Sequence, residues 1–361
     1  MPPGRLRARS GGRRSLAALA AAVLGALAAG GATGASAEAA GAHPSIVQLG
    51  DSVASGEGTL YGYTYSPLTQ RWSGGNVNVT WPGPYPLCHD SPDAYGQVVA
   101  DRLGATFSQF ACTGSSFDNG VSAPRVNKGY LYDTTLRPAQ FGDWADHKDL
   151  NADYDAAKPD VVMVTMGADD VQFVEIVEAC IENGYEYYFD LTSTLDCTAE
   201  NPGSTVTTDF VDQLPTLEDH DRTLVAWIKA RAQADGTPPP GVVFTDYYNP
   251  LPAAGRTCLD VSYLYPGQTA YLSGLLQTLD DRIVSTITGL HDPGVSVVDI
   301  ASALDGHRFC STDPWAYGLS IYKLDQPTSA WSQAPFHPTP AGQQAIADLV
   351  QPAVERALAR G

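Results

Sequence analysis

Apolar and polar positions alternate along the chain in a pattern that predicts strands and helices in turn. Candidate strands are the short apolar runs over residues 45–49, 106–111, 161–166, 242–247 and 295–300. The run VVMVTM, at 161–166, is almost continuously apolar, which is typical of a strand buried on both faces of a parallel sheet. Helices are predicted between and after these runs, over residues 93–103, 217–234, 269–290 and 340–358.

The order of these elements predicts the fold class. Strand–helix alternation is typical of an α/β protein, here a three-layer α/β/α sandwich around a parallel sheet of five strands. Ligands of such sheets bind beyond the carboxyl ends of the strands. Polar clusters follow several of the apolar runs, among them Gly50-Asp51-Ser52 and Gly167-Ala168-Asp169-Asp170. We therefore expect the functional site at this edge of the sheet.

Two segments do not fit the alternation. Residues 55–92 are rich in Gly, Tyr, Trp and Pro, and residues 180–216 contain a run of tyrosines that ends at Phe189. We expect both to be enlarged loops or small subdomains near the strand ends, and surface decoration without a role is an equally open alternative. Residues 38–361 have no internal repeat and no linker, so a single domain is predicted there.

The first 37 residues differ in composition from the rest. They begin with five arginines, continue with an apolar run over 16–29 and end in Ala35-Ser36-Ala37. This order predicts a secretory signal peptide that is cleaved after Ala37. The general export route is favoured over a twin-arginine route, which the pair Arg13-Arg14 loosely fits. The apolar run is too short to span a bilayer core of about 30 Å, so no stable membrane anchor is expected.

Charge narrows the class of partner. The chain has 21 Lys+Arg and 40 Asp+Glu, a formal net charge of -19. Removal of residues 1–37 takes away five arginines and no acid, which leaves 16 basic against 40 acidic residues and a net charge of -24. A protein this acidic is a poor binder of polyanions, so neither nucleic acid nor an anionic lipid surface is an expected partner.

All six cysteines lie after residue 37. An even number of cysteines on an exported chain indicates disulfides. Their spacing favours bonds between neighbours, which pairs Cys88 with Cys112, Cys180 with Cys197, and Cys258 with Cys310. The alternative is a metal site, but the chain has no C-x-x-C and no H-E-x-x-H spacing. We therefore predict neither a metal nor another cofactor.

Three residues, Ser52, Gly114 and His337, have the chemistry that acyl transfer requires. Ser52 follows the first predicted strand, where a turn can present its hydroxyl at the edge of the sheet, although G-D-S alone is also compatible with a plain turn. A serine nucleophile needs a base within hydrogen-bond reach, and His337 lies just before the last predicted helix. The main-chain N–H groups of Ser52 and Gly114 could donate to the oxyanion that forms.

Taken together, these segments resemble the SGNH (GDSL-type) hydrolase superfamily, in particular its secreted actinobacterial lipase/esterase branch. The resemblance covers nearly all of residues 38–361, and the matching blocks come in the family's order: Gly50-Asp51-Ser52, Ala111-Cys112-Thr113-Gly114, Gly167-Ala168-Asp169-Asp170 and His337-Pro338. It implies a flavodoxin-like sandwich, Ser52 as nucleophile, His337 as base, Ser52 and Gly114 as oxyanion donors, and three neighbour-paired disulfides.

The third block departs from the family at Asp169, where the family usually has an asparagine that donates to the oxyanion. An ionised carboxylate only accepts hydrogen bonds, and loss of one donor typically costs about 10²–10³ in rate. A protonated carboxyl group can donate. Our hypothesis is that Asp169 is kept protonated or has been displaced from the donor role, which predicts activity that favours acidic pH.

The second departure lies three residues before His337, where many members have an aspartate and this chain has Ala334. Members of the actinobacterial branch can use a main-chain carbonyl at this place. We therefore expect the Ala334 carbonyl to orient the imidazole and complete a Ser–His dyad. Asp305 and Asp313 stay open as alternative acceptors.

The resemblance implies a secreted, monomeric serine esterase or lipase that hydrolyses a carboxylic ester, small or polymeric, through an acyl-enzyme. A carbohydrate (acetyl) esterase is one alternative, because aromatic insertions suit sugar rings as well as acyl chains. A non-catalytic binding protein on a degenerate SGNH scaffold is another. Asp169 favours this last alternative, and retention of Ser52, Gly114 and His337 opposes it.

Overall fold

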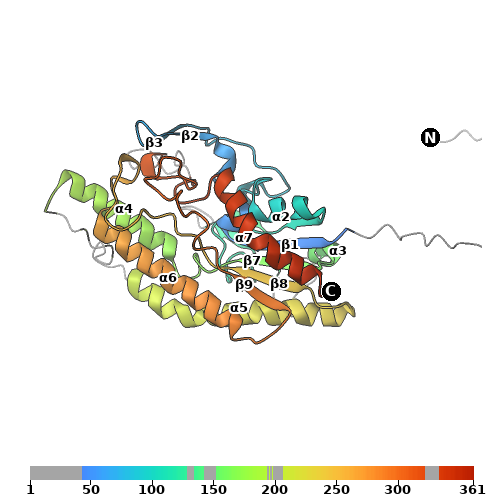
Figure 1. Cartoon of the computed structure of the whole chain (residues 1–361). Coiled ribbons are helices and arrows are strands. Elements are labelled where there is room, and N and C mark those ends of the chain that lie inside the picture. Colours follow the sequence, from blue (N-terminus) through green and yellow to red (C-terminus); the bar gives the residue numbers. More distant parts are fainter. Residues whose placement is uncertain are drawn as a thin grey trace, which may run out of the picture. The chain divides into compact units, whose positions relative to one another are not determined.

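The computed structural model describes residues 43–127, 134–141, 152–192, 195, 197, 206–321 and 333–361 (Figure 1). The predicted signal peptide over 1–37 lies outside them. All five predicted strands are present: β1 (Ser45–Gly50), β4 (Thr106–Gln109), β7 (Val161–Thr165), β8 (Gly241–Thr245) and β9 (Val295–Val298). They form one parallel sheet in the order β4-β1-β7-β8-β9. This is the 2-1-3-4-5 order of flavodoxin-like folds, which confirms the predicted fold class.

Helices cover both faces of this sheet (Figure 1). On one face lie α2 (Tyr95–Leu103) and α7 (Pro340–Leu358), and on the other lie α5 (Val206–Asp235) and α6 (Pro266–Thr288). In α7 the buried Ile346, Val350 and Val354 repeat at four-residue intervals and form an apolar stripe. This helix begins at Pro340, and the side chain of Thr339 caps it by accepting from the Gly342 N–H.

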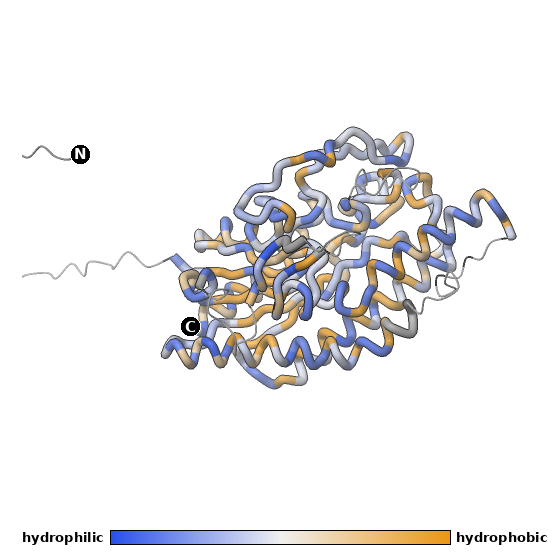
Figure 2. Tube along the Cα trace, turned by 180° about the vertical axis from the view of Figure 1, so that it is seen from behind, coloured by the Kyte–Doolittle hydropathy of each residue, from blue (hydrophilic) through white to orange (hydrophobic). Residues whose placement is uncertain are grey.

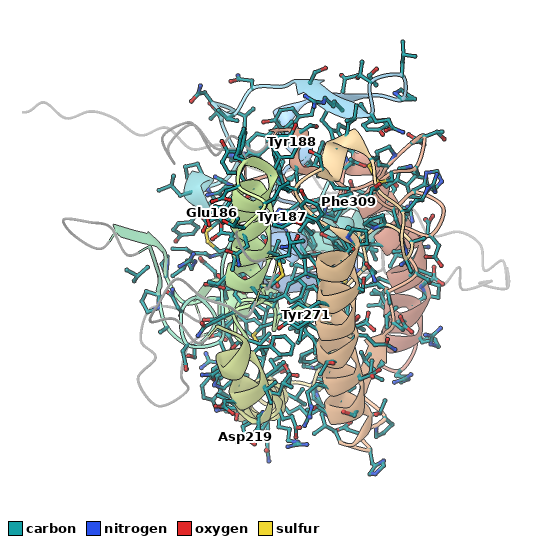
Figure 3. All side chains as sticks on the ribbon, turned by 90° about the vertical axis from the view of Figure 1, so that its left-hand side faces the viewer. Glu186, Tyr187, Tyr188, Asp219, Tyr271 and Phe309 are labelled. Carbon is teal, nitrogen blue, oxygen red and sulfur yellow. A yellow bond between two sulfur atoms is a disulfide. The ribbon has the colours of Figure 1, made fainter. Side chains whose placement is uncertain are left out.

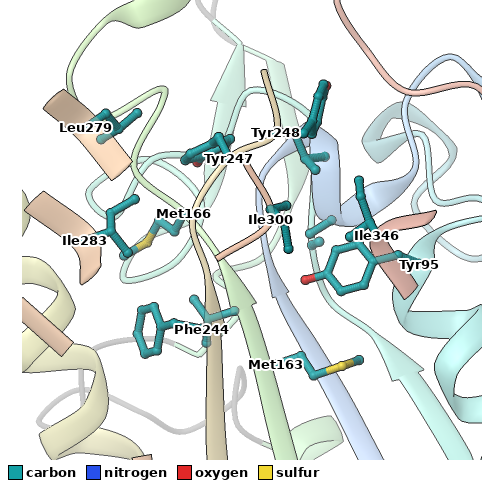
Figure 4. Close-up of a cluster of buried hydrophobic side chains, with 14 of the residues drawn as sticks. Tyr95, Met163, Met166, Phe244, Tyr247, Tyr248, Leu279, Ile283, Ile300 and Ile346 are labelled. Atoms are coloured by element: carbon teal, nitrogen blue, oxygen red, sulfur yellow. The ribbon is translucent and has the colours of Figure 1, made fainter. Parts of the chain in front are cut away.

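The core has one layer on each side of the sheet. Figure 4 shows Leu279 and Ile283 of α6 on one side of the strands, and Tyr95 and Ile346 of α2 and α7 on the other. All four side chains are fully buried. Figure 2 shows hydrophobic residues gathered in the strands and alternating with hydrophilic ones along the helices. The apolar repeats of the sequence are thus the residues that hold the three layers together.

Shorter elements connect these strands and helices, and most of them lie around the carboxyl edge of the sheet. They are α1 (Ser52–Ser55), η1 (Thr59–Tyr61), β2 (Tyr63–Ser66), β3 (Arg71–Gly74), η2 (Pro86–Cys88), β5 (Arg125–Asn127), β6 (Thr134–Arg137), α3 (Ala152–Ala157), η3 (Leu259–Val261) and η4 (Leu319–Ile321). β2 pairs with β3 and β5 with β6, both antiparallel. Residues 55–92 consist mostly of loops and short turns, together with the β2–β3 pair. No helix in the described ranges is long and apolar enough to cross a membrane.

The prediction of a loop over 180–216 is wrong for most of the described residues in this range. A long helix, α4 (Phe173–Phe189), extends into it, and α5 begins at Val206. Figure 3 shows Tyr187 and Tyr188 near the end of α4, beside α6 with Tyr271. The rings of Tyr187 and Tyr188 make edge contacts with tyrosines just before α6, at 265 and 263. These contacts stabilise a helix whose aromatic residues have only modest intrinsic helix propensity.

Three disulfides join sequence neighbours: Cys88–Cys112, Cys180–Cys197 and Cys258–Cys310. They close loops with sequence separations of 24, 17 and 52 residues. The first one anchors the segment after β4, which bears Gly114, to the end of the 55–92 loop. The third joins the segment after β8 to the segment after β9.

Candidate active site

Ser52 lies at the turn where β1 ends and α1 begins, beside the neighbouring strand β7. The carbonyl oxygen of Thr165 occupies the space that a side chain at Gly50 would need, and Gly50 has a φ of 138°. Only glycine fits this turn without strain. The side chain of Asp51 caps α1 by accepting from the Val53 N–H at 2.9 Å. Ser52 is therefore held rigidly, with its side chain partly exposed at the carboxyl edge of the sheet.

A buried glutamine from a distant segment holds the same turn. The Gln140 side chain accepts from the Gly50 N–H and donates to the Gly50 carbonyl, both at 2.7 Å. Gln140 is only 2% exposed. The sequence analysis did not identify this residue, because nothing along 90 residues of intervening chain indicates the pairing.

His337 reaches this turn from the loop before α7. Its Nε2 lies 2.7 Å from Ser52 Oγ, within hydrogen-bond distance. The His337 carbonyl accepts from the Tyr317 N–H at 3.0 Å, and the carbonyl of Phe336 accepts from the Tyr248 hydroxyl at 2.8 Å. These bonds fix the loop on both sides of the ring. The structure thus brings together the two residues that the sequence analysis paired.

The second imidazole nitrogen faces main chain rather than a carboxylate. Nδ1 of His337 is buried without a well-directed hydrogen bond to any described residue. The nearby carbonyls of Gln333 and Pro335 act to raise the pKa of His337. The Ala334 carbonyl accepts from the His337 main-chain N–H at 2.9 Å. The carbonyls beside the ring therefore belong to the residues flanking Ala334, and the role predicted for Ala334 stays a prediction.

A buried glutamate, which the sequence analysis missed, acts on His337 from one side. Glu57 is fully buried, and its Oε2 lies 2.5 Å from Nδ1 of His89. Burial acts to raise the pKa of Glu57, but the hydrogen bond and charge of His89 outweigh it and leave the pKa below its ordinary value. Burial lowers the pKa of His337, and the negative charge of Glu57 opposes this effect. The site therefore has a carboxylate near the imidazole, although not at the family's position.

Gly114 and Asp169 lie on the other side of Ser52. Gly114 follows β4 with a φ of 67°, and the Cys112 N–H donates to the Gly50 carbonyl at 3.0 Å, which brings this segment beside the Ser52 turn. Asp169 follows β7, next to Ala168, whose N–H donates to the Tyr247 hydroxyl at 2.9 Å. Both residues line the cavity that contains Ser52.

Carboxyl groups crowd this side of the site and perturb one another. Burial raises the pKa of Asp169 well above its ordinary value, and the charge of Asp51 adds to the shift. Burial likewise raises the pKa of Asp51 to about 7, although the Tyr247 hydroxyl donates to it at 2.5 Å. Two carboxyl groups held this close do not both ionise readily. The direction of the shift in Asp169 agrees with the hypothesis that it is protonated.

A cavity of about 640 Å³ opens over these residues. One wall comes from α4 and α6 and is apolar except for Glu178; its apolar residues are Phe173, Val174, Val177, Ile181 and Leu276. The polar end contains Ser52, His337, Gly114 and Asp169. Its volume suits a small organic ligand. Among the described residues, no group of three or more His, Cys, Asp or Glu side chains could hold a metal ion.

This geometry defines a class of protein. A flavodoxin-like α/β/α sandwich carries, at the carboxyl edge of its sheet, a serine hydroxyl hydrogen-bonded to an imidazole, with main-chain N–H groups near the serine. Such an arrangement suits acyl transfer from an ester. The chain belongs to the GDSL-like lipase/acylhydrolase family, whose sequence model matches residues 46–350. The protein is accordingly a carboxylic ester hydrolase.

Solved structures that match this chain include two from Streptomyces. The phospholipase A1 from Streptomyces albidoflavus has 19% sequence identity and a TM-score of 0.50; the match covers 88% of this chain and 100% of that one. The extracellular lipase from Streptomyces rimosus has 17% identity and a TM-score of 0.47, with 87% and 99% covered. A carbohydrate esterase family 2 enzyme from Corynascus thermopiles (Myceliophthora fergusii) has 14% identity and a TM-score of 0.44, with 88% and 67% covered. A search of curated proteins finds no match.

Proposed function

We propose that this protein is a secreted serine esterase that cleaves carboxylic esters of acyl chains through a Ser52–His337 dyad. The observation that carries the proposal is the 2.7 Å separation of His337 Nε2 from Ser52 Oγ. His337 takes the hydroxyl proton as Ser52 Oγ attacks the acyl carbon, and then gives this proton to the leaving alcohol. The acyl-enzyme is resolved by a water molecule that His337 deprotonates in turn, which returns Ser52 to its starting state.

The oxyanion forms next to the main-chain N–H groups of Ser52 and Gly114. Asp169 adds a third donor while its carboxyl group is protonated, in place of the asparagine amide of the family. The groups that face Asp169 are Asp51, Asp170, Glu175 and Arg125. Burial and the three carboxylates raise its pKa, and Arg125 opposes them.

The apolar wall of the cavity supports an acyl-chain ester over an acetylated polysaccharide. Val177 and Ile181 face the cavity one helical turn apart on α4, and Leu276 of α6 joins them. A hydrocarbon chain gains about 0.8 kcal/mol for each CH₂ group that it buries against such a wall. An acetyl group is too small to use it.

We further propose that residues 1–37 direct export and that 38–361 act as one monomeric domain. The basic, apolar and small-residue order of 1–37 supports export, and three disulfides in the structure are in keeping with an oxidising compartment. Expression of the full chain followed by mass spectrometry of the culture medium tests the export, and size-exclusion chromatography of the secreted product tests the monomeric state. A secreted product that begins at Glu38 is expected, and retention of the intact chain in the cell would contradict the proposal.

A fluorophosphonate probe tests the mechanism. We expect the probe to label the native protein and to leave Ser52→Ala unlabelled. His337→Ala should be labelled far more slowly than the native protein. Absence of labelling between pH 4 and 8 would favour a binding protein on the same scaffold. A series of p-nitrophenyl esters from acetate to palmitate, with acetyl-xylan beside it, tests the substrate class. Highest kcat/KM on acetyl-xylan would overturn the acyl-chain proposal and leave the dyad intact.

A further inference from the structure

A guanidinium group lies against the glycine that is expected to bind the oxyanion. Arg125 begins the β5 strand, and its Nη2 occupies the place that a Cβ at residue 114 would take. Any side chain at Gly114 would displace Arg125, quite apart from the strain at its φ of 67°. The glycine is therefore needed as much for the arginine beside it as for its own backbone conformation.

The rest of the arginine side chain is fixed in this position. Its Nε donates to the Thr113 carbonyl at 3.1 Å, and its Nη1 donates to the Val126 carbonyl at 2.8 Å. Asn119 in turn holds Val126 by accepting from its N–H and donating to its carbonyl. Nη2 makes no hydrogen bond to any of the residues that the structure describes. The side chain thus has two anchored nitrogens and a third that is left for a ligand.

The charges around Arg125 are almost all negative. Arg125 is the only lysine or arginine among the described residues that line the cavity, which also has Asp51, Asp169 and Glu178 in its wall. Burial lowers the pKa of Arg125, and Asp169 opposes this effect. A guanidinium nonetheless keeps its proton at every pH at which proteins are folded. The polar end of the cavity therefore contains one fixed positive charge.

We propose that Arg125 is a further catalytic residue, which stabilises the oxyanion of the ester with the guanidinium nitrogen that lies against Gly114. The inference rests on the acyl-transfer mechanism proposed above. As the carbonyl carbon is attacked, negative charge develops on the oxygen next to the Gly114 N–H, and Nη2 donates to it from the adjacent position. No proton is transferred in this contact, because the guanidinium stays charged throughout.

This role accounts for the tolerance of an aspartate where the family has asparagine. An ionised Asp169 beside the oxyanion would repel it, but Arg125 offsets that charge. When Asp169 is protonated, the guanidinium charge acts on the oxyanion unopposed. The arginine is therefore predicted to matter most at a pH at which Asp169 is ionised, and less once Asp169 is replaced by a neutral donor.

A double-mutant cycle on a neutral ester, p-nitrophenyl butyrate, tests the proposal. At alkaline pH, where Asp169 is ionised, Arg125→Gln is expected to lower kcat by about 10² or more in the native background, with KM changed less than about threefold. In the Asp169→Asn background the same change is expected to cost only about tenfold, because no carboxylate is left unopposed. Losses below threefold in both backgrounds would overturn the proposal. A rise in KM with kcat unchanged, confined to esters that carry an anionic group, would assign Arg125 to substrate binding instead.

Two further measurements separate this role from a structural one. Arg125→Lys loses both main-chain anchors but keeps a positive charge. Because of that charge, it is expected to retain more activity than Arg125→Gln. Methylguanidinium is expected to restore part of the kcat of Arg125→Ala and to leave the native enzyme unchanged. Two results together would contradict the proposal. In the first, Arg125→Ala is folded but inactive and methylguanidinium does not restore its activity. In the second, Arg125→Lys is no more active than Arg125→Gln. If the native protein does not react with fluorophosphonate, the acyl-transfer mechanism itself has failed, which is a different result.

Discussion

The main-chain N–H of Glu57 donates to the carbonyl oxygen of Ser52 at 3.0 Å. This bond joins a fully buried carboxylate to the residue that bears the reactive hydroxyl. On the far side Gly58 packs against Ala334, in the loop that bears His337. Glu57 therefore lies beside the segments that bear both members of the dyad, and it acts on the imidazole through its charge rather than through a hydrogen bond.

Replacement of Glu57 by glutamine should lower the pKa of His337. The negative charge of Glu57 raises that pKa against the effect of burial, so its removal lets burial act alone. The base must be neutral, so the acid limb of the kcat/KM profile is expected to move to lower pH. The maximum kcat should fall about tenfold, because the imidazolium formed during attack loses a favourable charge.

The matched control is Glu186→Gln, which removes an exposed charge at the end of α4 (Figure 3). Its pH profile should coincide with that of the native enzyme. Equal shifts in both variants would mean that net charge, rather than the position of Glu57, sets the pKa of His337.

A second prediction concerns Asp169 and the alkaline side of the pH profile. A protonated Asp169 donates to the oxyanion, and its pKa is raised by burial and by the charge of Asp51. Activity is therefore expected below that pKa and should decline as the pH rises through it. Asp169→Asn keeps a donor at every pH, so this variant should gain activity at neutral and alkaline pH. Profiles from pH 5 to 9 measure this, and a flat native profile with no gain in the variant would refute it.

The sequence predicts the scaffold of this site better than the site's surroundings. Ser52 and Gly114 follow strands that apolar runs mark clearly, so their place at one edge of the sheet can be inferred from the order of elements. Asp169 could be placed in the same way, yet its protonation depends on Asp51 and other groups that come together only in three dimensions. Helix α4 was missed because its second half is aromatic and its stability depends on tertiary contacts.

Residues that act through a neighbour leave no periodic signal. Gln140 clamps a turn that precedes it by 90 residues, and Glu57 meets His89 across a loop without regular structure. Arg125 sits on a short strand whose position depends on side-chain bonds from Asn119. Each of these partners is selected by packing, and no spacing rule along the chain predicts it.

The clamp at Gln140 is expected to contribute to stability as well as to activity. Gln140→Leu keeps most of the side-chain volume but leaves the Gly50 N–H buried without an acceptor, while the Gly50 carbonyl retains the Cys112 N–H. Such an unpaired group costs about 1–3 kcal/mol. Urea unfolding should show this loss, and kcat should fall because the turn that holds Ser52 loosens.

An exposed glutamine on α7 serves as the comparison for this substitution. Gln344→Leu should change the free energy of unfolding by less than about 0.5 kcal/mol. A Gln140→Leu protein with native stability would show that the two hydrogen bonds to Gly50 contribute nothing net.

The disulfides should contribute unequally to stability. A cross-link restricts the unfolded chain more when it closes a longer loop, so the chain-entropy relation assigns about 4 kcal/mol to Cys258–Cys310 and about 3 kcal/mol to Cys180–Cys197. The separations of 52 and 17 residues determine this order. Double alanine variants of each pair, unfolded in urea under oxidising conditions, provide the comparison. Equal losses, or a larger loss for the shorter loop, would show that local packing outweighs loop closure.

The apolar wall of the cavity should determine which acyl chains are cleaved. Val177 is almost buried, lines the cavity from α4 and lies one helical turn from Ile181. A tryptophan at position 177 would fill part of the roughly 640 Å³ and shorten the space along the wall. We expect Val177→Trp to lower kcat/KM about tenfold or more on p-nitrophenyl palmitate and to leave the acetate ester nearly unchanged, because a two-carbon acyl group does not reach the wall.

Val211→Trp is the matched control, because Val211 is 55% exposed on α5 and does not line the cavity. It should leave the chain-length profile of the native enzyme unchanged. Overpacking of the wall costs about 1–3 kcal/mol, so circular dichroism must show that Val177→Trp is folded at the assay temperature. A folded Val177→Trp enzyme that still cleaves palmitate and acetate in the native ratio would mean that the acyl chain does not bind along this part of the wall.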